Sequence, residues 1–238
     1  MAAQGDAGGK AKTMREIPAL FNGAMVRAII NDRKTQTRRP LPAVFNSPPS
    51  LVHGWLRPGW RLLGQDVPDR WGAQWYGTYP SMVRSPLGKP GDRLWVREAH
   101  AWVDYLVGSE LEDPVCVAFA ADNRAFSFAG KKPVQLDTYG WPWDRIKYRP
   151  SIHMPRWAAR LFLGVADVRI ERLQDISEED ARAEGVDRNE GKWVDEDGRT
   201  RSSYRLAFQR LWISVYGAAS WAANPWVWVT EFKRVRQP

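Results

Sequence analysis

Hydrophobic and polar residues alternate along several short stretches of this chain, and the alternation predicts β-strands. The clearest stretches are residues 93–98 and 160–173, where apolar side chains recur at alternate positions. Residues 226–233 are rich in Trp, Val, Thr and Phe, which favour strands. Residues 17–21 and 115–120 are shorter segments of the same kind. We therefore expect a chain in which strands outnumber helices.

Three segments carry helical signals. Residues 22–33 contain an apolar stripe at helical spacing. Residues 177–184 begin with a capping serine and three acidic residues, and Gly185 follows where helices commonly end. Residues 204–215 place apolar side chains on one face. The order of these elements predicts the α+β class, with a small β-barrel flanked by helices.

The remaining segments suggest how the domain is organised. Residues 1–14 are small and polar, and we expect a disordered tail. Residues 15–238 then form a single domain with loop-rich, aromatic insertions at about 41–90 and 122–150, because prolines interrupt regular structure there. The charged stretch 187–202 is expected to be mobile.

Composition excludes several classes of protein. No run approaches 18 apolar residues, so we expect no transmembrane helix. Cys116 is the only cysteine, which excludes an internal disulfide and a cysteine-based zinc site and makes a reducing cytoplasm the simplest location. The three histidines lack the short spacings of metal sites, and neither a P-loop nor an esterase elbow motif is present. We therefore expect neither a metal nor a cofactor.

The charge balance favours a nucleic acid or nucleotide partner. The formal net charge is +8, arginines make up 26 of the 35 basic residues, and the chain contains 14 tryptophans. Arginine binds phosphates through two hydrogen bonds and stacks on bases, and tryptophan also stacks on bases. The alternative is that arginine pairs with acidic and aromatic residues on a solvated surface.

The densest polar cluster, residues 32–39, contains the first candidate catalytic residues. Lys34 and Thr37 are three positions apart and would share one face if the preceding helix continued. A lysine of lowered pKa beside a hydroxyl can act as a base beside a nucleophile. Glu184, at the unfavourable end of its helix dipole, is the second candidate. A solvated helix end and an ordinary surface glutamate are the alternatives.

A second group of candidates lies on the strand 93–98. Arg97 and Glu98 close this strand and would point into the mouth of a barrel, unless they form only an edge ion pair. Trp95 on the same strand can stack on a base. We assign these three residues to substrate binding.

Four segments occur in an order that resembles the ASCH domain family of the PUA-like superfamily. They are Asp-Arg-Lys-Thr-Gln-Thr-Arg-Arg at 32–39, Gly-Asp-Arg-Leu-Trp-Val at 91–96, the segment 173–185, and Trp-Val-Thr-Glu-Phe-Lys at 228–233. Residues 151–157 and 224–228 look like those of long members carried by bacteriophages and prophages. The resemblance implies the ASCH fold, a small barrel with helices beside a cleft for a nucleoside or RNA, in the cytoplasm of a bacterium or a phage-infected host.

The resemblance also implies an activity, because small bacterial relatives are amidohydrolases that remove acetyl from N4-acetylcytidine. Their lysine, threonine and glutamate match Lys34, Thr37 and Glu184, and an arginine matches Arg39. In the mechanism that we expect, Lys34 as the free amine takes the proton of Thr37 and the alkoxide attacks the acyl carbon. Glu184 then protonates the leaving amine or steers water in the second step. Arg39, with Arg97, would stabilise the oxyanion. Lys34 could instead be the nucleophile.

Two other functions stay open from the sequence. One is an RNA-binding or modified-nucleic-acid-binding module without turnover, and the other is a ribonuclease. The chain also departs from the small enzymes, because it is more than twice their length and Pro40 directly follows Arg39.

Overall fold

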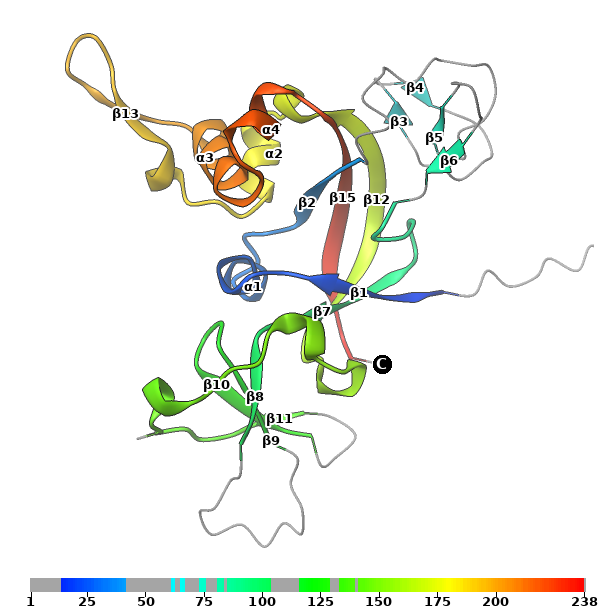
Figure 1. Cartoon of the computed structure of the whole chain (residues 1–238), viewed down its shortest axis with the longest axis vertical. Coiled ribbons are helices and arrows are strands. Elements are labelled where there is room, and N and C mark those ends of the chain that lie inside the picture. The colour runs from blue at the N-terminus through cyan, green and yellow to red at the C-terminus, as the bar shows by residue number, and fades with distance from the viewer. Residues whose placement is uncertain are drawn as a thin grey trace, which may run out of the picture.

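Strands from distant parts of the chain form the main sheet of this protein (Figure 1). The computed structural model describes residues 14–41, 85–103, 116–128, 133–139 and 141–237, and the backbone of four short strands between residues 61 and 83. The main path of the sheet joins, in spatial order, β1 (Glu16–Leu20), β7 (Arg93–Arg97), β12 (Phe162–Arg172), β15 (Trp226–Val235) and β2 (Gln36–Pro40). Strand β1 is parallel to β7, and the other pairs on this path are antiparallel.

Smaller elements surround this sheet. The second sheet has the order β11 (Val134–Gln135), β10 (Arg124–Ser127), β9 (Cys116–Phe119) and β8 (His100–Val103). The short strands are β3 (Arg61–Leu62), β4 (Gln65–Asp66), β5 (Ala73–Trp75), β6 (Ser81–Val83), β13 (Lys192–Val194) and β14 (Thr200–Ser202). The α-helices are α1 (Gly23–Ile30), α2 (Glu178–Ala183), α3 (Tyr204–Tyr216) and α4 (Ala218–Ala222). Single 3₁₀ turns are Trp143–Arg145, Ser151–His153, Arg156–Ala158, Leu173–Asp175 and Arg188–Gly191.

The predicted α+β class is confirmed, but the predicted small barrel is not. Strands β1 and β2 lie at opposite ends of the main path, and no pairing between them occurs in the described parts of the chain. The sheet described here is therefore open. The predicted tail at 1–14 lies outside the described residues except for Met14. Of the predicted insertion at 41–90, the structure describes residues 41 and 85–90 and the backbone of the four short strands β3, β4, β5 and β6.

The strand predictions at 17–21, 93–98, 115–120, 160–173 and 226–233 correspond to β1, β7, β9, β12 and β15. The first helix is shorter than predicted, because α1 ends at Ile30 and Asp32 adopts a φ of 53°. Residues 36–40 form the edge strand β2 instead of a helix end.

The charged stretch 187–202 is also more regular than predicted. It contains the 3₁₀ turn Arg188–Gly191 and the hairpin of β13 and β14. The side chain of Asp187 caps the 3₁₀ turn, and Gly198 supplies a positive φ of 76° at the hairpin turn.

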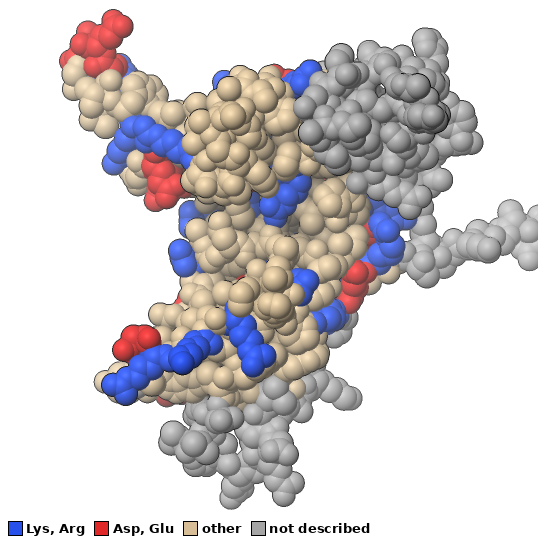
Figure 2. Space-filling view, in the orientation of Figure 1, with Lys and Arg blue, Asp and Glu red and all other residues tan. Residues whose placement is uncertain are grey.

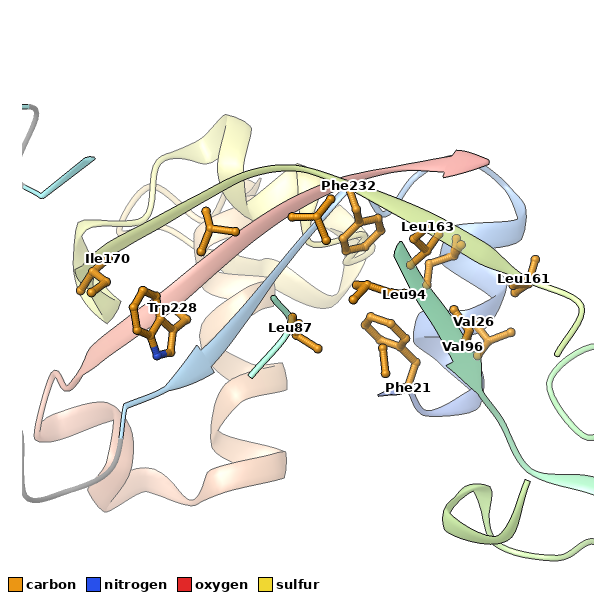
Figure 3. Close-up of a cluster of buried hydrophobic side chains, with 14 of the residues drawn as sticks. Phe21, Val26, Leu87, Leu94, Val96, Leu161, Leu163, Ile170, Trp228 and Phe232 are labelled. Atoms are coloured by element: carbon orange, nitrogen blue, oxygen red, sulfur yellow. The ribbon is translucent and has the colours of Figure 1, made fainter. Parts of the chain in front are cut away.

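Three hydrophobic clusters hold these elements together. The largest lies between α1 and the main sheet, where Phe21, Val26, Leu94 and Phe232 are almost fully buried (Figure 3). A second cluster packs α2 and α3 against the other face of β15. The third joins Phe162 of β12 to the second sheet. The helices thus occupy both faces of the strand pair β15–β2, and β2 forms the edge between them.

Candidate functional site

Lys34 lies in the turn that follows α1, and this turn brings it against the end of α2. The left-handed conformation of Asp32 reverses the chain, and the main-chain N–H of Lys34 donates to the carbonyl of Ala28 at 3.1 Å. Lys34 and Glu184 then form an isolated antiparallel β-bridge. The main chains therefore place two residues 150 positions apart side by side, independently of the contact between their side chains.

The side chains of Lys34 and Glu184 form a buried ion pair. The Nζ atom of Lys34 donates to Oε2 of Glu184 at 2.7 Å and to the main-chain carbonyl of Glu184 at 2.9 Å. The side chains are 0% and 3% exposed, respectively. Glu184 is held in place because Ser177 caps the start of α2 and Glu184 itself is the C-terminal cap.

Gly185 permits this close approach. Its φ is 82°, and a Cβ atom at this position would lie 2.7 Å from Cβ of Lys34. Any side chain would therefore combine an unfavourable backbone conformation with a steric clash. Gly185 is therefore needed twice: it ends α2, and it leaves the space in which Lys34 reaches Glu184.

The pair belongs to a larger group of charges that we call the ion cluster. Its members are Lys34, Arg38, Arg169, Glu171, Asp180, Glu184 and Glu231. Arg38 is its centre, because its fully buried guanidinium group bonds Glu171, Asp180 and Glu184. These bonds connect β2 to β12 and to α2. The cluster therefore fixes both the edge strand and the helix that carries Glu184.

Burial lowers the pKa of the Lys34 amine, since water no longer solvates the charged form. The carboxylate of Glu184 opposes this shift, and the guanidinium groups of Arg39 and Arg38 add to it. The amine is therefore shifted toward the free base that proton abstraction requires.

Thr37 and Arg39 lie on β2, beside Glu184. Together with Arg38 and Glu184 they line a narrow cleft of about 30 Å³ whose opposite wall is the apolar face of α3, including Phe208. Arg39 donates to the carbonyl of Leu20 at 2.7 Å. A volume of this size has room for about two water molecules.

The hydroxyl of Thr37 makes no hydrogen bond within the described residues, so Lys34 Nζ is not bonded to it in this structure. The prediction that Lys34 and Thr37 share one helical turn is wrong, because both lie beyond the end of α1 and Thr37 is in a strand. Tertiary structure nevertheless places Thr37 at the same cleft as Glu184.

A second, wider cavity of about 240 Å³ adjoins the cleft. Met25, Glu184 and Leu211 line both spaces, so these three residues mark where the cleft and the cavity meet. The cavity has a polar wall that includes Arg27 and Arg33 of the α1 region. The site thus has a small compartment beside Thr37 and a larger compartment beside two cations.

The three predicted substrate-binding residues on β7 and just beyond it make contacts elsewhere. Trp95 packs against the third hydrophobic cluster, and the Arg97 guanidinium lies 5.4 Å from its ring. Arg97 also donates to the carbonyl of Ile152. Glu98 is 1% exposed and accepts two hydrogen bonds from Arg160, at 2.9 and 2.8 Å.

None of Trp95, Arg97 and Glu98 lines either compartment of the site. The ion pair of Glu98 is buried and is formed with Arg160, so it differs from the edge ion pair with Arg97 that was considered from the sequence.

Sequence reasoning missed Arg38 and its partners. No local sequence signal marks the burial of Arg38, because its partners lie on β12 and α2, far away along the chain. Among the described residues, no group of three or more His, Cys, Asp or Glu side chains is arranged to hold a metal ion. None of the helices within the described ranges is both long and apolar enough to cross a membrane.

Comparisons of the chain with models of protein families, with characterised proteins and with solved structures found no match.

Proposed function

We propose that this protein is an amidohydrolase that removes the acyl group from N4-acetylcytidine or a related modified cytidine, either free or within a nucleic acid. The observation that carries the proposal is the buried Lys34–Glu184 pair, which adjoins a cleft lined in part by Thr37. An amine of lowered pKa, an alcohol without a hydrogen-bond partner in the described structure and a buried acid are the groups that acyl transfer requires. The proposed reaction involves no metal.

The proposed chemistry proceeds through an acyl-threonine. The Lys34–Glu184 pair, with the amine unprotonated, accepts the proton of Thr37 as its oxygen bonds to the acyl carbon. Arg39 stabilises the oxyanion that forms. The bond from carbon to N4 then breaks, and the pair returns the proton to the leaving amine. A water molecule, deprotonated by the same pair, releases the acid and restores Thr37.

The two compartments support this assignment of roles. The narrow cleft matches the size of an acetyl group, which has three heavy atoms, better than that of a base. The adjoining cavity is large enough for part of a nucleoside and has Arg27 and Arg33 beside it for a phosphate or ribose. We therefore place the acyl group beside Thr37, the N4 atom near Glu184 and the nucleoside in the larger compartment.

A relationship to the ASCH domains is part of the same proposal. Three of the four segments that resemble the family lie together: β2 pairs with β15, and α2 packs beside β2. This arrangement supports the proposal because it places the matching lysine and glutamate in contact.

The proposal is tested by incubating the protein with N4-acetylcytidine, both free and within an oligoribonucleotide, and measuring cytidine by chromatography. Thr37→Val keeps the volume and strand preference but removes the nucleophile, and we expect at least a 1,000-fold loss of kcat/KM, about 4 kcal/mol. Glu98→Gln is the matched control, because Glu98 belongs to a buried ion pair that does not line the site. We expect its activity to stay within a few-fold of the unaltered protein.

Two results would count against the proposal. One is a folded protein that leaves all acylated cytidines intact at substrate concentrations well above ordinary KM values. The other is a Thr37→Val variant that is as active as Glu98→Gln.

A further inference from the structure

Residues 145–149 carry a row of cations that the site described above does not use. Arg145, Lys147 and Arg149 are exposed, whereas the alternating Ile146 and Tyr148 are partly buried. Burial raises the pKa of the Tyr148 hydroxyl, so the side chain stays neutral and adds no negative charge near the row. Arg145 ends the 3₁₀ turn Trp143–Arg145, and the backbone at Ile146 is extended. The three charges therefore lie close together along one short segment of the chain.

These cations have no acidic partner. No ion pair or side-chain hydrogen bond of Arg145, Lys147 or Arg149 exists within the described residues. Several other arginines do form ion pairs, as in the bonds of Arg160 to Glu98 and Asp122. The only acidic residues between positions 133 and 157 are Asp137 and Asp144. The row is thus a local excess of positive charge open to an outside anion.

Aromatic rings flank the row at both ends, and those of Trp141 and Trp143 are partly buried. Trp141 and Trp143 precede it, with ring centroids 5.5 Å apart. The other end is joined to β8 by the bridge between His100 and Arg149. Two residues further along β8, Trp102 stacks on Trp157 with centroids 5.1 Å apart.

Tyr139, at 97% exposed, lies just before this segment. Trp157 and Trp102 are 47% and 37% exposed, respectively. Trp102 and Trp157 cover one face of each other by stacking, and the exposed part of each of these rings remains accessible to a ligand.

We propose that this surface, Tyr139 and residues 141–157 together with Trp102, binds single-stranded nucleic acid. The cation row follows the phosphates, and the exposed rings stack on unpaired bases. A duplex fits less well because its bases are already stacked and their faces are hidden. Figure 2 shows basic side chains running across the lower part of the molecule, the region that holds β10 in Figure 1.

This inference does not depend on amide hydrolysis. A protein that never cleaves an acylated cytidine can still bind a strand through this surface. If both proposals hold, the surface makes a polymer the preferred substrate over a free nucleoside.

The test measures the fluorescence anisotropy of a labelled 12-nucleotide oligouridine in buffers of increasing salt. The variant removes the row: Arg145→Ala, Lys147→Ala and Arg149→Ala together. The matched control removes three other exposed cations without ion-pair partners in the described residues: Lys192→Ala, Lys233→Ala and Arg236→Ala. Both triple variants change the net charge equally, so a difference between them reports position and not total charge.

We expect the row variant to lose at least tenfold in affinity and the control less than threefold. The slope of log affinity against log salt becomes shallower by about 2 in the row variant, since three phosphate contacts are lost. Trp102→Ala weakens binding with the salt slope unchanged, because stacking releases no counterions. A 12-base-pair duplex RNA binds more weakly than the single strand.

Three outcomes overturn the inference. The first is no binding of oligouridine at 50 mM salt by the unaltered protein, and the second is equal losses in the two triple variants. The third is loss of binding to anionic phospholipid vesicles in the row variant while oligouridine binding persists, which would assign the surface to a membrane. Circular dichroism of each variant checks that it is folded.

Discussion

Removing the two partners of the buried ion pair one at a time should have unequal effects on stability. Within the ion cluster, the cations Lys34, Arg38 and Arg169 face four carboxylates. Lys34→Met leaves two cations against four anions, whereas Glu184→Gln leaves three against three. We therefore expect the lysine variant to be the less stable of the two.

The magnitudes follow from the bonds that each variant loses. Lys34→Met removes a charged hydrogen bond to Glu184 and leaves the main-chain carbonyl of Glu184 without its donor. Such losses in a buried pair lower the free energy of unfolding by about 3–5 kcal/mol. Glu184→Gln keeps an oxygen that can accept from Lys34 or Arg38, so we expect about 1–2 kcal/mol. Asp180, Glu171 and Glu231 are partly solvated, which moderates the charge imbalance in both cases.

The assay is urea unfolding followed by tryptophan fluorescence, with thermal unfolding as a second probe. For a chain of this size, 1 kcal/mol corresponds to about 2–4 °C in Tm. The double variant Lys34→Met/Glu184→Gln should lose less than the sum of the single variants, since the two residues interact directly. Equal losses in the two single variants, or a greater loss in Glu184→Gln, would show that charge balance does not govern this cluster.

Three further predictions follow from the same structure. Gly185→Ala should destabilise the protein by more than 1 kcal/mol in thermal unfolding, because its Cβ would clash with Lys34; Gly198→Ala, which has a positive φ but open space, should cost less. Between the lowered pKa of Lys34 and its usual 10.5 the unfolded chain binds more protons, so the free energy of unfolding should rise with pH there, and Lys34→Met should lack this rise in urea titrations. Burial also lowers the pKa of His100 below 6.5, so stability should fall as the pH drops below 6.5, with a smaller slope in His100→Gln.

Much of the fold is predictable from local sequence because the central strands of the main sheet are long or show a clear alternation of apolar and polar residues. In β12 and β15 apolar side chains pack into clusters on both faces of the sheet, and their residues favour strands. The hairpin of β13 and β14 was missed although Asp197-Gly198 is a typical turn signal. The many charged residues around this turn suggested a mobile segment. The turn signal was nevertheless the better guide, because the segment forms a hairpin.

The candidate site was identified through the wrong local structure. The spacing of Lys34 and Thr37 suggested a helical face, whereas the chain turns at Asp32 and enters β2. The contact of Lys34 with Glu184 depends on a β-bridge between residues 150 positions apart, and no local pattern specifies such a bridge. Burial of Arg38 was unpredictable for a similar reason, because its partners come from β12 and α2.

The order of strands in the main sheet has a consequence for biosynthesis. Strands β1 and β2 are separated along the chain only by α1, yet they occupy opposite ends of the sheet path, with β7, β12 and β15 between them. Strand β2 pairs only with β15 among the described strands, so it has no partner until β15 has been translated. At about 5–20 residues per second, the ribosome needs on the order of 10–40 s to cover that distance. Throughout this interval β2, which carries Arg38, lacks the strand with which it pairs in the folded protein.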